Sequence, residues 1–286
     1  MLKGSASDFE MQMYIELRDR TVYPSRYEFL KGHNGIRPNS LTGLMSSTGA
    51  GKTTLLKCII AETALHGAKV LLWLSEETIV EYQELLYFID KSCLKNIVFI
   101  EETEIDEQYK DTQENFFAYF EQMVEESGAD IVFIDNVTTS NFYSQVYGIA
   151  GQAKTATFLR SFTKRVCEVF YIAHTKSEIT ENYSKVINSE DIRGSKELPH
   201  RTEYLYIIQK FTSNGKQYNC LRVAKYRHHE KAEGWFSLAY ENRTYIGDAK
   251  VPFNLINKIF SSRDYFGKRV KAKKPDSIDL KKDKKK

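Results

Sequence analysis

The chain has 286 residues, of which 42% are hydrophobic and 28% charged, so it can bury one sizeable core and leaves little room for a second complete domain. Its net charge of +3 is unevenly distributed: residues 268–286 hold ten Lys/Arg and three Asp, a charge of +7, which leaves −4 for the rest. A generally basic nucleic-acid-binding surface is therefore excluded, and any affinity for nucleic acid must come from local loops or from this tail.

Two further features narrow the class of protein. The four cysteines form no C-x-x-C pair, so neither a zinc site nor a disulfide framework is indicated, and buried, reduced thiols are expected; they are Cys58, Cys93, Cys167 and Cys220. No stretch is long enough to span a membrane, and residues 1–20 carry too many charges for a signal peptide. We therefore expect a soluble, cytoplasmic protein with no membrane contact.

Residues 1–38 are interpreted as an amino-terminal arm or linker helix. They hold a polar helical stretch, DFEMQMYIELRDR, followed by a loop with two prolines and two glycines before the first strand. Such a segment either docks on a neighbouring subunit or covers the sheet of its own chain, and the sequence leaves both interpretations open.

Residues 39–250 are predicted to form one α/β domain. Short apolar runs rich in β-branched residues alternate with longer amphipathic segments, which predicts a mostly parallel twisted sheet with helices on both faces. The predicted strands are SLTGLMS, KVLLWLS, NIVFIEE, DIVFIDN and EVFYIAHT, and the predicted helices start at Gly51, start at Glu77, and cover residues 111–127 and 155–167.

After His174 the pattern changes to closely spaced strands. TEYLYIIQKF, YNCLRVAKYRH and GWFSLAYENRTYIG follow one another with turn-like segments between them, as antiparallel hairpins do. A C-terminal helix is expected over residues 251–267. Residues 268–286 are basic and poor in apolar residues, which predicts a disordered tail.

The segment SSTGAGKT, which starts at Ser46, has the spacing of a Walker A phosphate-binding loop, with Ser46 in place of the usual first glycine. It lies between a predicted strand and a predicted helix, as this chemistry requires. Gly49 and Gly51 let backbone N–H groups converge on phosphates, and Lys52 neutralises the β and γ oxygens of ATP. The predicted nucleotide-binding residues of this loop are Ser46, Gly49, Gly51, Lys52, Thr53 and Thr54.

Acidic side chains at strand ends complete the predicted site. Asp135 ends DIVFID, where its carboxylate can reach Mg²⁺ through water, and the Thr53 hydroxyl is the other expected protein contact of the metal. Glu76 and Glu77 follow the strand KVLLWLS, and one of them can deprotonate the attacking water. We choose Glu76 and assign Glu77 to the first turn of the next helix. An ordinary strand-end aspartate at a turn is the competing interpretation of Asp135.

Together with the phosphate loop, five elements occur in an order that resembles the RecA-like ATPase of DnaB-type hexameric replicative helicases, above all the compact phage members of that family. They are the strand-end Glu76, Asp135, the strand FYIAHTK with His174, and the segments DIRGSKEL and KYR. The resemblance runs over residues 40–248. It implies a RecA-like fold, ATP and Mg²⁺ as cofactors, and a hexameric ring of identical subunits that moves 5′ to 3′ on single-stranded DNA.

The resemblance also implies roles for residues outside the phosphate loop. In such helicases the histidine after the fourth core strand senses the γ-phosphate and couples it to a DNA-binding loop; His174 matches it, with a local hydrogen bond as the alternative. The family's K-x-R pair acts on the ATP of the adjacent subunit and matches Lys225 and Arg227. An arginine there offsets charge on the γ-phosphoryl group in the transition state. An exposed basic strand end is the other interpretation of this pair.

The implied DNA contacts lie in two loops, residues 138–151 and 176–191, and just after the second one. The first loop suits backbone contacts to phosphates, and the second offers two lysines among several acids. Some phage helicases stack a nucleotide base where this chain has Tyr240, although packing on its strand explains this tyrosine equally well. The implied DNA-binding residues are Lys176, Lys185, Arg193, Gly194, Ser195 and Tyr240.

The sequence thus predicts an ATP hydrolase that unwinds DNA during replication, in a bacterial host cytoplasm if a phage encodes it. Two other classes remain: an ATP-switched recombination or single-strand-binding protein, and a helicase loader without motor activity. A polymerase, a primase or a loader is a possible partner. The chain shows no amino-terminal primase or primase-docking segment, so primer synthesis is not expected and coupling to a primase stays open. Its tail is basic where some phage relatives hold a polymerase with an acidic tail, so that contact is not carried over from the family.

Overall fold

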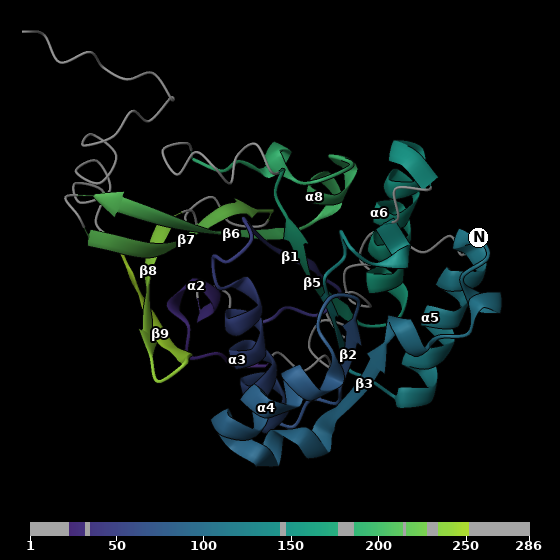
Figure 1. The fold of residues 1–286 in the computed structure, drawn as a ribbon, viewed down its shortest axis with the longest axis horizontal. Helices are drawn as coiled ribbons and strands as arrows, with labels where there is room; N and C mark the ends of the chain where they lie inside the picture. Colours follow the sequence, from purple (N-terminus) through teal and green to yellow (C-terminus); the bar gives the residue numbers. More distant parts are fainter. Residues whose placement is uncertain are drawn as a thin grey trace, which may run out of the picture.

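The structure is a computed structural model, and it describes residues 23–31, 35–143, 147–176, 186–213, 216–227 and 234–251. These residues form one nine-stranded sheet in the order β3-β2-β4-β5-β1-β6-β7-β8-β9 (Figure 1). The strands are β1 Leu41–Ser46, β2 Val70–Leu74, β3 Ile97–Glu101, β4 Ile131–Asp135, β5 Glu168–His174, β6 Tyr204–Ser213, β7 Lys216–Tyr226, β8 Gly234–Glu241 and β9 Thr244–Lys250.

The sheet is parallel from β3 to β6 and antiparallel from β6 to β9. The predicted mostly parallel α/β sheet is therefore confirmed. Two details differ from the prediction. Strand β6 starts the antiparallel part but also pairs in parallel with β1. The segment GWFSLAYENRTYIG folds into two strands, β8 and β9, joined by Asn242 and Arg243 with φ of 47° and 66°; both residues adopt the left-handed conformation that a two-residue hairpin turn requires.

Helices cover both faces of the sheet (Figure 1). One apolar cluster contains the inner sides of α2, α3 and α4, and a second contains those of α5, α6 and α8. Residues of β2 alternate between them, with Leu72 and Leu74 in the first and Leu71 and Trp73 in the second, which explains the uninterrupted apolar runs of the central strands. The helices are α2 Glu28–Lys31, α3 Lys52–Leu65, α4 Ile79–Asp90, α5 Gln113–Ser127, α6 Gly148–Arg165 and α8 Glu197–Arg201, and short 3₁₀ turns lie at Lys91–Asn96, Glu102–Glu104, Glu107–Tyr109, Asn141–Tyr143 and Ser189–Asp191.

Two predicted helix starts are corrected. Helix α4 begins at Ile79 rather than at Glu77, because the Thr78 side chain accepts the Glu81 N–H while the Glu81 side chain accepts the Thr78 N–H. Helix α6 begins at Gly148 rather than near residue 155, so the last part of the predicted DNA loop 138–151 is helical. All four cysteines are buried, as predicted.

The predicted arm, residues 1–38, lies partly outside the described residues. The predicted tail lies wholly outside them, and so does the predicted C-terminal helix except for Val251. The described part of the arm packs on the domain: Tyr27, Phe29 and Leu30 are buried in the apolar cluster that also contains the inner side of α3. The Tyr27 hydroxyl donates to the Tyr245 carbonyl on β9 at 2.8 Å. None of the helices in the described part of the chain has the length and apolar character needed to cross a bilayer.

Candidate active site at the carboxyl edge of the sheet

Four parallel strands bring the predicted site residues to one edge of the sheet. Ser46 at the end of β1 is paired with His174 at the end of β5, and Leu74 at the end of β2 is paired with Asp135 at the end of β4. Glu76 follows β2 by two residues. Because the carboxyl ends of parallel strands share one edge, residues that lie 128 positions apart in the chain become neighbours.

The loop from Ser46 to Gly51 has the backbone conformation that its glycines allow. Gly49 and Gly51 have φ of 73° and 92°, in the left-handed region, and the Gly51 turn leads directly into α3. A Cβ on Gly51 would overlap the Tyr245 hydroxyl, so close packing also requires glycine at that position. Ser46 is fully buried and its hydroxyl donates to the Ser47 carbonyl at 2.8 Å, which explains why serine fits where the usual pattern has glycine.

Lys52 is the first residue of α3 and is buried, with 6% of its surface exposed. Burial lowers the pKa of its ammonium group, and the nearby carboxylates of Glu76, Asp135 and Glu77 act in the opposite direction. A desolvated cation beside the amino end of a helix favours an anionic ligand. Thr53 and Thr54 follow it on α3, both half-buried.

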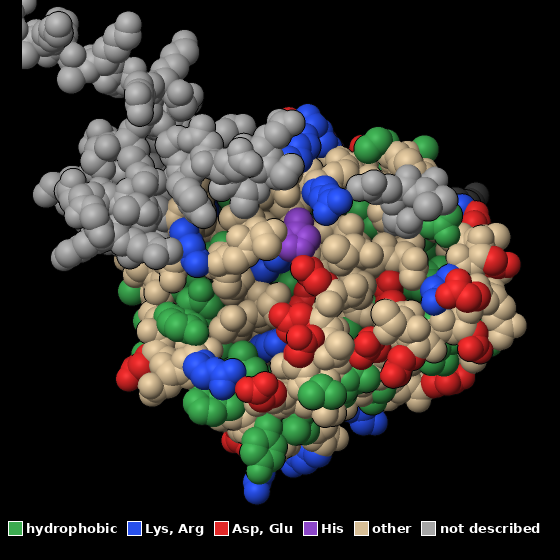
Figure 2. All heavy atoms as spheres, viewed as in Figure 1, with side chains coloured by type: hydrophobic (Ala, Val, Ile, Leu, Met, Phe, Trp, Pro, Cys, Tyr) green, Lys and Arg blue, Asp and Glu red, His purple; other side chains and the backbone are tan. Residues whose placement is uncertain are grey.

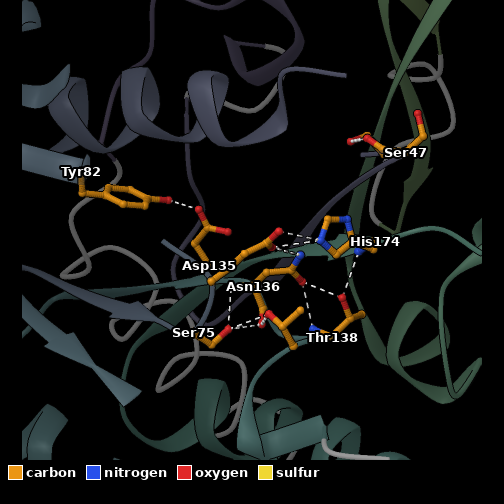
Figure 3. A network of polar contacts seen from close by, with 10 residues as sticks. Ser47, Ser75, Tyr82, Asp135, Asn136, Thr138 and His174 are labelled. Atoms are coloured by element: carbon orange, nitrogen blue, oxygen red, sulfur yellow. Dashed lines mark hydrogen bonds and ion pairs between the residues drawn. The ribbon is translucent and has the colours of Figure 1, made fainter. Parts of the chain in front are cut away.

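Asp135 is buried at the end of β4, and burial raises the pKa of its carboxyl group to about 7. Its Oδ2 accepts a hydrogen bond from the Tyr82 hydroxyl on α4 (Figure 3). Its Oδ1 is buried and has no hydrogen-bond partner in the described part of the chain. A buried, unpartnered carboxylate oxygen is costly, and a metal-bound water molecule would supply the missing donor.

The magnesium ion expected here fits these residues. Mg²⁺ keeps several waters and is held by one or two protein oxygens together with the phosphates of its substrate. Asp135 and Thr53 are such a pair of oxygen donors, and the buried Oδ1 is the atom that lacks a partner. Within the described residues, no group of three or more His, Cys, Asp or Glu side chains could hold a metal ion by itself.

The two adjacent glutamates point to different partners. Glu77 forms an ion pair with Lys57 on α3 at 2.5 Å. The Glu76 carboxylate accepts hydrogen bonds from His174 Nε2 at 3.0 Å and from Asn136 Nδ2 at 3.0 Å. The hydrogen bond from His174 is the main reason that the pKa of Glu76 falls to about 2, so its carboxylate is ionised at neutral pH. The prediction that Glu77 lies in the first turn of α4 is wrong, because this helix starts two residues later.

Asn136 and Thr138 join these groups into one network (Figure 3). Asn136 Oδ1 accepts from the Thr138 backbone N–H at 2.9 Å and from its hydroxyl at 2.7 Å. The Thr138 hydroxyl in turn accepts the His174 backbone N–H at 3.2 Å. Sequence reasoning missed Asn136; its place directly after the strand-end Asp135 was the available signal.

The end of β5 is tied to the segment that the resemblance associates with DNA. The backbone N–H of Arg193 donates to the His174 carbonyl at 2.9 Å, and Thr175 pairs with Ile192 in an isolated antiparallel bridge. Arg193 is exposed, and so is Lys176, whose backbone N–H donates to the Asp191 carbonyl. Lys185 lies outside the described residues.

Gly194 and Ser195, two of the predicted DNA-binding residues, pack against side chains from distant segments. Ser195 is buried; its N–H donates to Gln152 Oε1 at 2.9 Å, and its carbonyl accepts the Tyr143 hydroxyl at 2.7 Å. Gly194 has φ of 99° and lies against Tyr143 and Gln152, which a Cβ would overlap. These contacts tie the segment to Gln152 on α6 and to Tyr143, so the side chain of Ser195 is turned inward, whereas Gly194 is half-buried. The predicted DNA contacts of these two residues stay a prediction.

The predicted first DNA loop is partly interior as well. Glu102, directly after β3, is buried and accepts hydrogen bonds from Trp73 Nε1 at 2.5 Å, from the Asn141 N–H at 2.9 Å and from the Ser140 hydroxyl. This holds the described part of the loop against the sheet. Tyr240, by contrast, is 56% exposed, with its ring edge-on to Tyr245 at 5.2 Å between centroids.

Lys225 and Arg227 lie at the opposite, amino edge of the sheet. The backbone N–H of Arg227 donates to the Glu203 carbonyl, and the Glu203 N–H donates to the carbonyl of Leu41 at the start of β1. Leu41 lies five residues before Ser46. At roughly 3.3 Å per residue, Arg227 is therefore about 16 Å away from the phosphate loop along the strand direction. The Lys225 ammonium donates to the carbonyls of Pro199 and His200 at 2.9 and 2.7 Å.

The Arg227 guanidinium also donates to the His200 carbonyl, at 3.2 Å, so both cations cap the carboxyl end of α8. Burial, and then the charge of Arg227, lowers the pKa of Lys225 to about 8. Glu104, Asp106, Glu107 and Glu114 are exposed in the segments that follow β3 and begin α5. Figure 2 shows acidic side chains on the side of the molecule where Figure 1 places α5.

Comparison with known proteins adds no family assignment. No protein-family model matches the chain, and no curated protein is significantly similar to it.

Proposed function

We propose that the chain is the RecA-like ATPase of a ring-forming replicative helicase, which hydrolyses ATP to move along single-stranded DNA and to unwind duplex. One observation carries the ATPase part of this proposal: the phosphate loop, Asp135, Glu76 and His174 lie together at one edge of the sheet. The helicase part is supported by the order of the motifs in the chain and by the backbone connection between His174 and Arg193.

Nucleotide binding would use the loop and the amino end of α3. The left-handed glycines leave backbone N–H groups free of Cβ obstruction around the phosphates, and Lys52 supplies a buried cation. Thr53 and Asp135 would hold Mg²⁺, which bridges the β and γ oxygens and offsets the charge that develops on them.

Water activation would fall to Glu76. Its carboxylate is ionised and can accept a proton from a water molecule placed in line with the γ-phosphate. In the present structure it accepts the Nε2–H of His174 instead. A single N–H cannot serve two anions at full strength, so a bound γ-phosphate would compete with Glu76 for His174 and leave the carboxylate available to water.

The same competition gives a route from ATP to DNA. If His174 turns toward the phosphate, the end of β5 and the segment paired with it, residues 191–193, are displaced together, because backbone hydrogen bonds join them. Arg193 is the exposed cation of that segment and would contact a DNA phosphate. Contacts of this kind are independent of base sequence, as translocation requires.

The test compares Lys52→Ala with Lys164→Ala, an exposed lysine on α6, in assays of ATP hydrolysis with and without single-stranded DNA and of forked-duplex unwinding. Lys52→Ala should lose nearly all hydrolysis, since phosphate charge is left uncompensated, while the control keeps wild-type rates. Normal hydrolysis by Lys52→Ala contradicts the site. DNA-stimulated hydrolysis without unwinding would favour a recombination protein, and hydrolysis that DNA does not stimulate would favour a loader.

A further inference from the structure

Tyr82 is a fully buried residue of α4 whose hydroxyl reaches the carboxylate of Asp135 on β4 (Figure 3). It does so from the face of the sheet that α3 also covers. The hydroxyl is the donor in this contact, because an ionised carboxylate has only acceptor oxygens. A phenylalanine ring could fill the same position in the core, but it would leave Asp135 Oδ2 without this donor.

Lys57 holds the ring of Tyr82 in place. Its ammonium group lies 4.3 Å from the ring centroid, forms the ion pair with Glu77 and donates to the Glu81 carbonyl at 3.1 Å. Lys57 is itself buried, with 6% of its surface exposed. A buried cation over an aromatic face is attracted to it, and three contacts together leave the lysine little freedom. The tyrosine therefore has a defined orientation before any ligand arrives.

The consequence for Asp135 is that its two oxygens are no longer equivalent. Oδ2 is engaged by Tyr82, whereas Oδ1 is buried and has no partner within the described residues. A carboxylate free to rotate about its Cβ–Cγ bond would present either oxygen to a metal-bound water. Here the hydroxyl selects the rotamer and leaves a single oxygen for that purpose.

We propose that Tyr82, supported by Lys57, is a positioning residue for metal–nucleotide binding: it fixes the Asp135 carboxylate so that Oδ1 serves the magnesium of a bound nucleoside triphosphate. This inference rests on the proposed nucleotide site but not on helicase activity. The competing role is that of a core tyrosine whose hydroxyl merely satisfies a buried carboxylate. The two roles differ in one measurable quantity, the dependence of nucleotide affinity on Mg²⁺.

The experiment measures the affinity of the full chain for a fluorescent ATP analogue in excess Mg²⁺ and in EDTA, for wild type, Tyr82→Phe and Tyr171→Phe. Tyr171 is the matched control: it is fully buried, and its hydroxyl is hydrogen-bonded to Thr202 at 2.6 Å within the other apolar cluster. Tyr82→Phe should reduce the Mg²⁺-to-EDTA affinity ratio about tenfold, the lower end of what residues supporting a metal ligand contribute. Its affinity in EDTA should stay at the wild-type value.

Tyr171→Phe should keep the wild-type ratio even if its melting temperature falls. A Tyr82→Phe protein with an unchanged ratio overturns the inference while leaving the nucleotide site intact. Wild-type protein that binds the analogue in neither buffer overturns the proposed function itself, so the two failures are distinguishable.

A second variant covers the case in which Tyr82→Phe does not fold. Lys57→Met keeps the ring and its hydroxyl but removes the cation above the ring and the link to Glu77. Its Mg²⁺-to-EDTA ratio should fall severalfold, less than in Tyr82→Phe, and the Mg²⁺ concentration at half-saturation should rise. A ratio equal to that of wild type would overturn the inference as stated, because the support of Lys57 would then have no effect on metal binding.

Discussion

The carboxyl and amino edges of the parallel sheet hold their charged side chains in different ways. At the carboxyl edge, Lys52, Asp135 and Glu76 come from three elements and lie close enough to shift one another's pKa. At the amino edge, Lys225 and Arg227 direct their cations at neutral carbonyl oxygens of α8. A phosphate is a stronger acceptor than a carbonyl, so these cations can exchange their present partners for an anion.

This difference indicates how a complete site would be assembled. Arg227 cannot reach the phosphate loop of its own chain, because the two lie at opposite ends of the strands. In a head-to-tail ring, each subunit presents a different surface to each of its neighbours, so the amino edge of one chain can meet the carboxyl edge of the next. The proposed ring would therefore place Arg227 of one subunit at the phosphate loop of the next, and three predictions test this arrangement and the two edges, from the largest effect to the smallest.

Arg227→Ala should bind ATP through its intact loop yet hydrolyse it about 10³-fold more slowly, the scale lost with an arginine that acts in a neighbour's site. Lys52→Ala should be inactive because its phosphate loop is damaged, although its Arg227 is intact. Mixing the two variants should restore measurable hydrolysis wherever the intact loop of one subunit meets the intact Arg227 of another. Steady-state hydrolysis across mixing ratios is the measurement, with subunit exchange shown separately by fluorescence transfer.

An exposed arginine of α6 supplies the control for this experiment: Arg165→Ala should hydrolyse ATP normally alone and in mixtures. Absence of rescue at every ratio, with exchange demonstrated, would mean that Arg227 serves only the end of α8.

Glu76→Gln tests the carboxyl edge without removing any cation. Loss of the proposed base should slow hydrolysis about 10²-fold or more while nucleotide affinity is kept, because glutamine can still accept from His174 but cannot take a proton. The hydrolysis rate of Glu77→Gln should fall by a factor at least tenfold smaller than that of Glu76→Gln, since the Glu77 side chain forms an ion pair with Lys57. Single-turnover hydrolysis separates chemistry from binding. If Glu77→Gln proves the slower variant, the two assignments must be exchanged.

Lys225→Met tests the amino edge through pH. Lys225 has a pKa of about 8 in the folded chain against 10.5 for an unperturbed lysine, because of burial and the Arg227 charge, with Glu203 acting in the opposite direction. The unfolded chain therefore binds more protons between these values, and this residue's contribution to stability rises with pH from about 8 to 10.5. The melting temperature of wild type relative to Lys225→Met should rise over that interval. A difference that is independent of pH would contradict the burial of this ammonium group.

The mostly parallel sheet could be predicted from the sequence, whereas side-chain contacts between helices and strands could not. Strand and helix alternation predicted the parallel sheet, and it placed Asp135, Glu76 and His174 together because parallel strands end at one edge. The roles of Tyr82 and Ser195 could not be predicted in this way. A tyrosine in an apolar helical pattern looks like any core residue, and its contact with Asp135 depends on how α4 is rotated against the sheet.

Ser195 illustrates the same limit from the other side. A small polar residue after a glycine is typical of an exposed loop, and its burial follows from Gln152 and Tyr143, which come from segments far away in the sequence. The hairpin turn at Asn242 and Arg243 was also missed, because it lacks the glycine that usually marks such turns. Residues whose role depends on strand order were predictable, and those whose role depends on side-chain packing between elements were not.

The backbone contact between His174 and Arg193 has a mechanical meaning. Hydrogen bonds between peptide groups are short and directional, so the end of β5 and residues 191–193 behave as one stiff piece instead of two loops that meet by chance. A displacement of the backbone at His174 would therefore displace the backbone at Arg193 by a comparable amount. If the proposed ATPase cycle operates, the displacement of Arg193 would be limited by how far the end of β5 moves when His174 turns toward a bound phosphate.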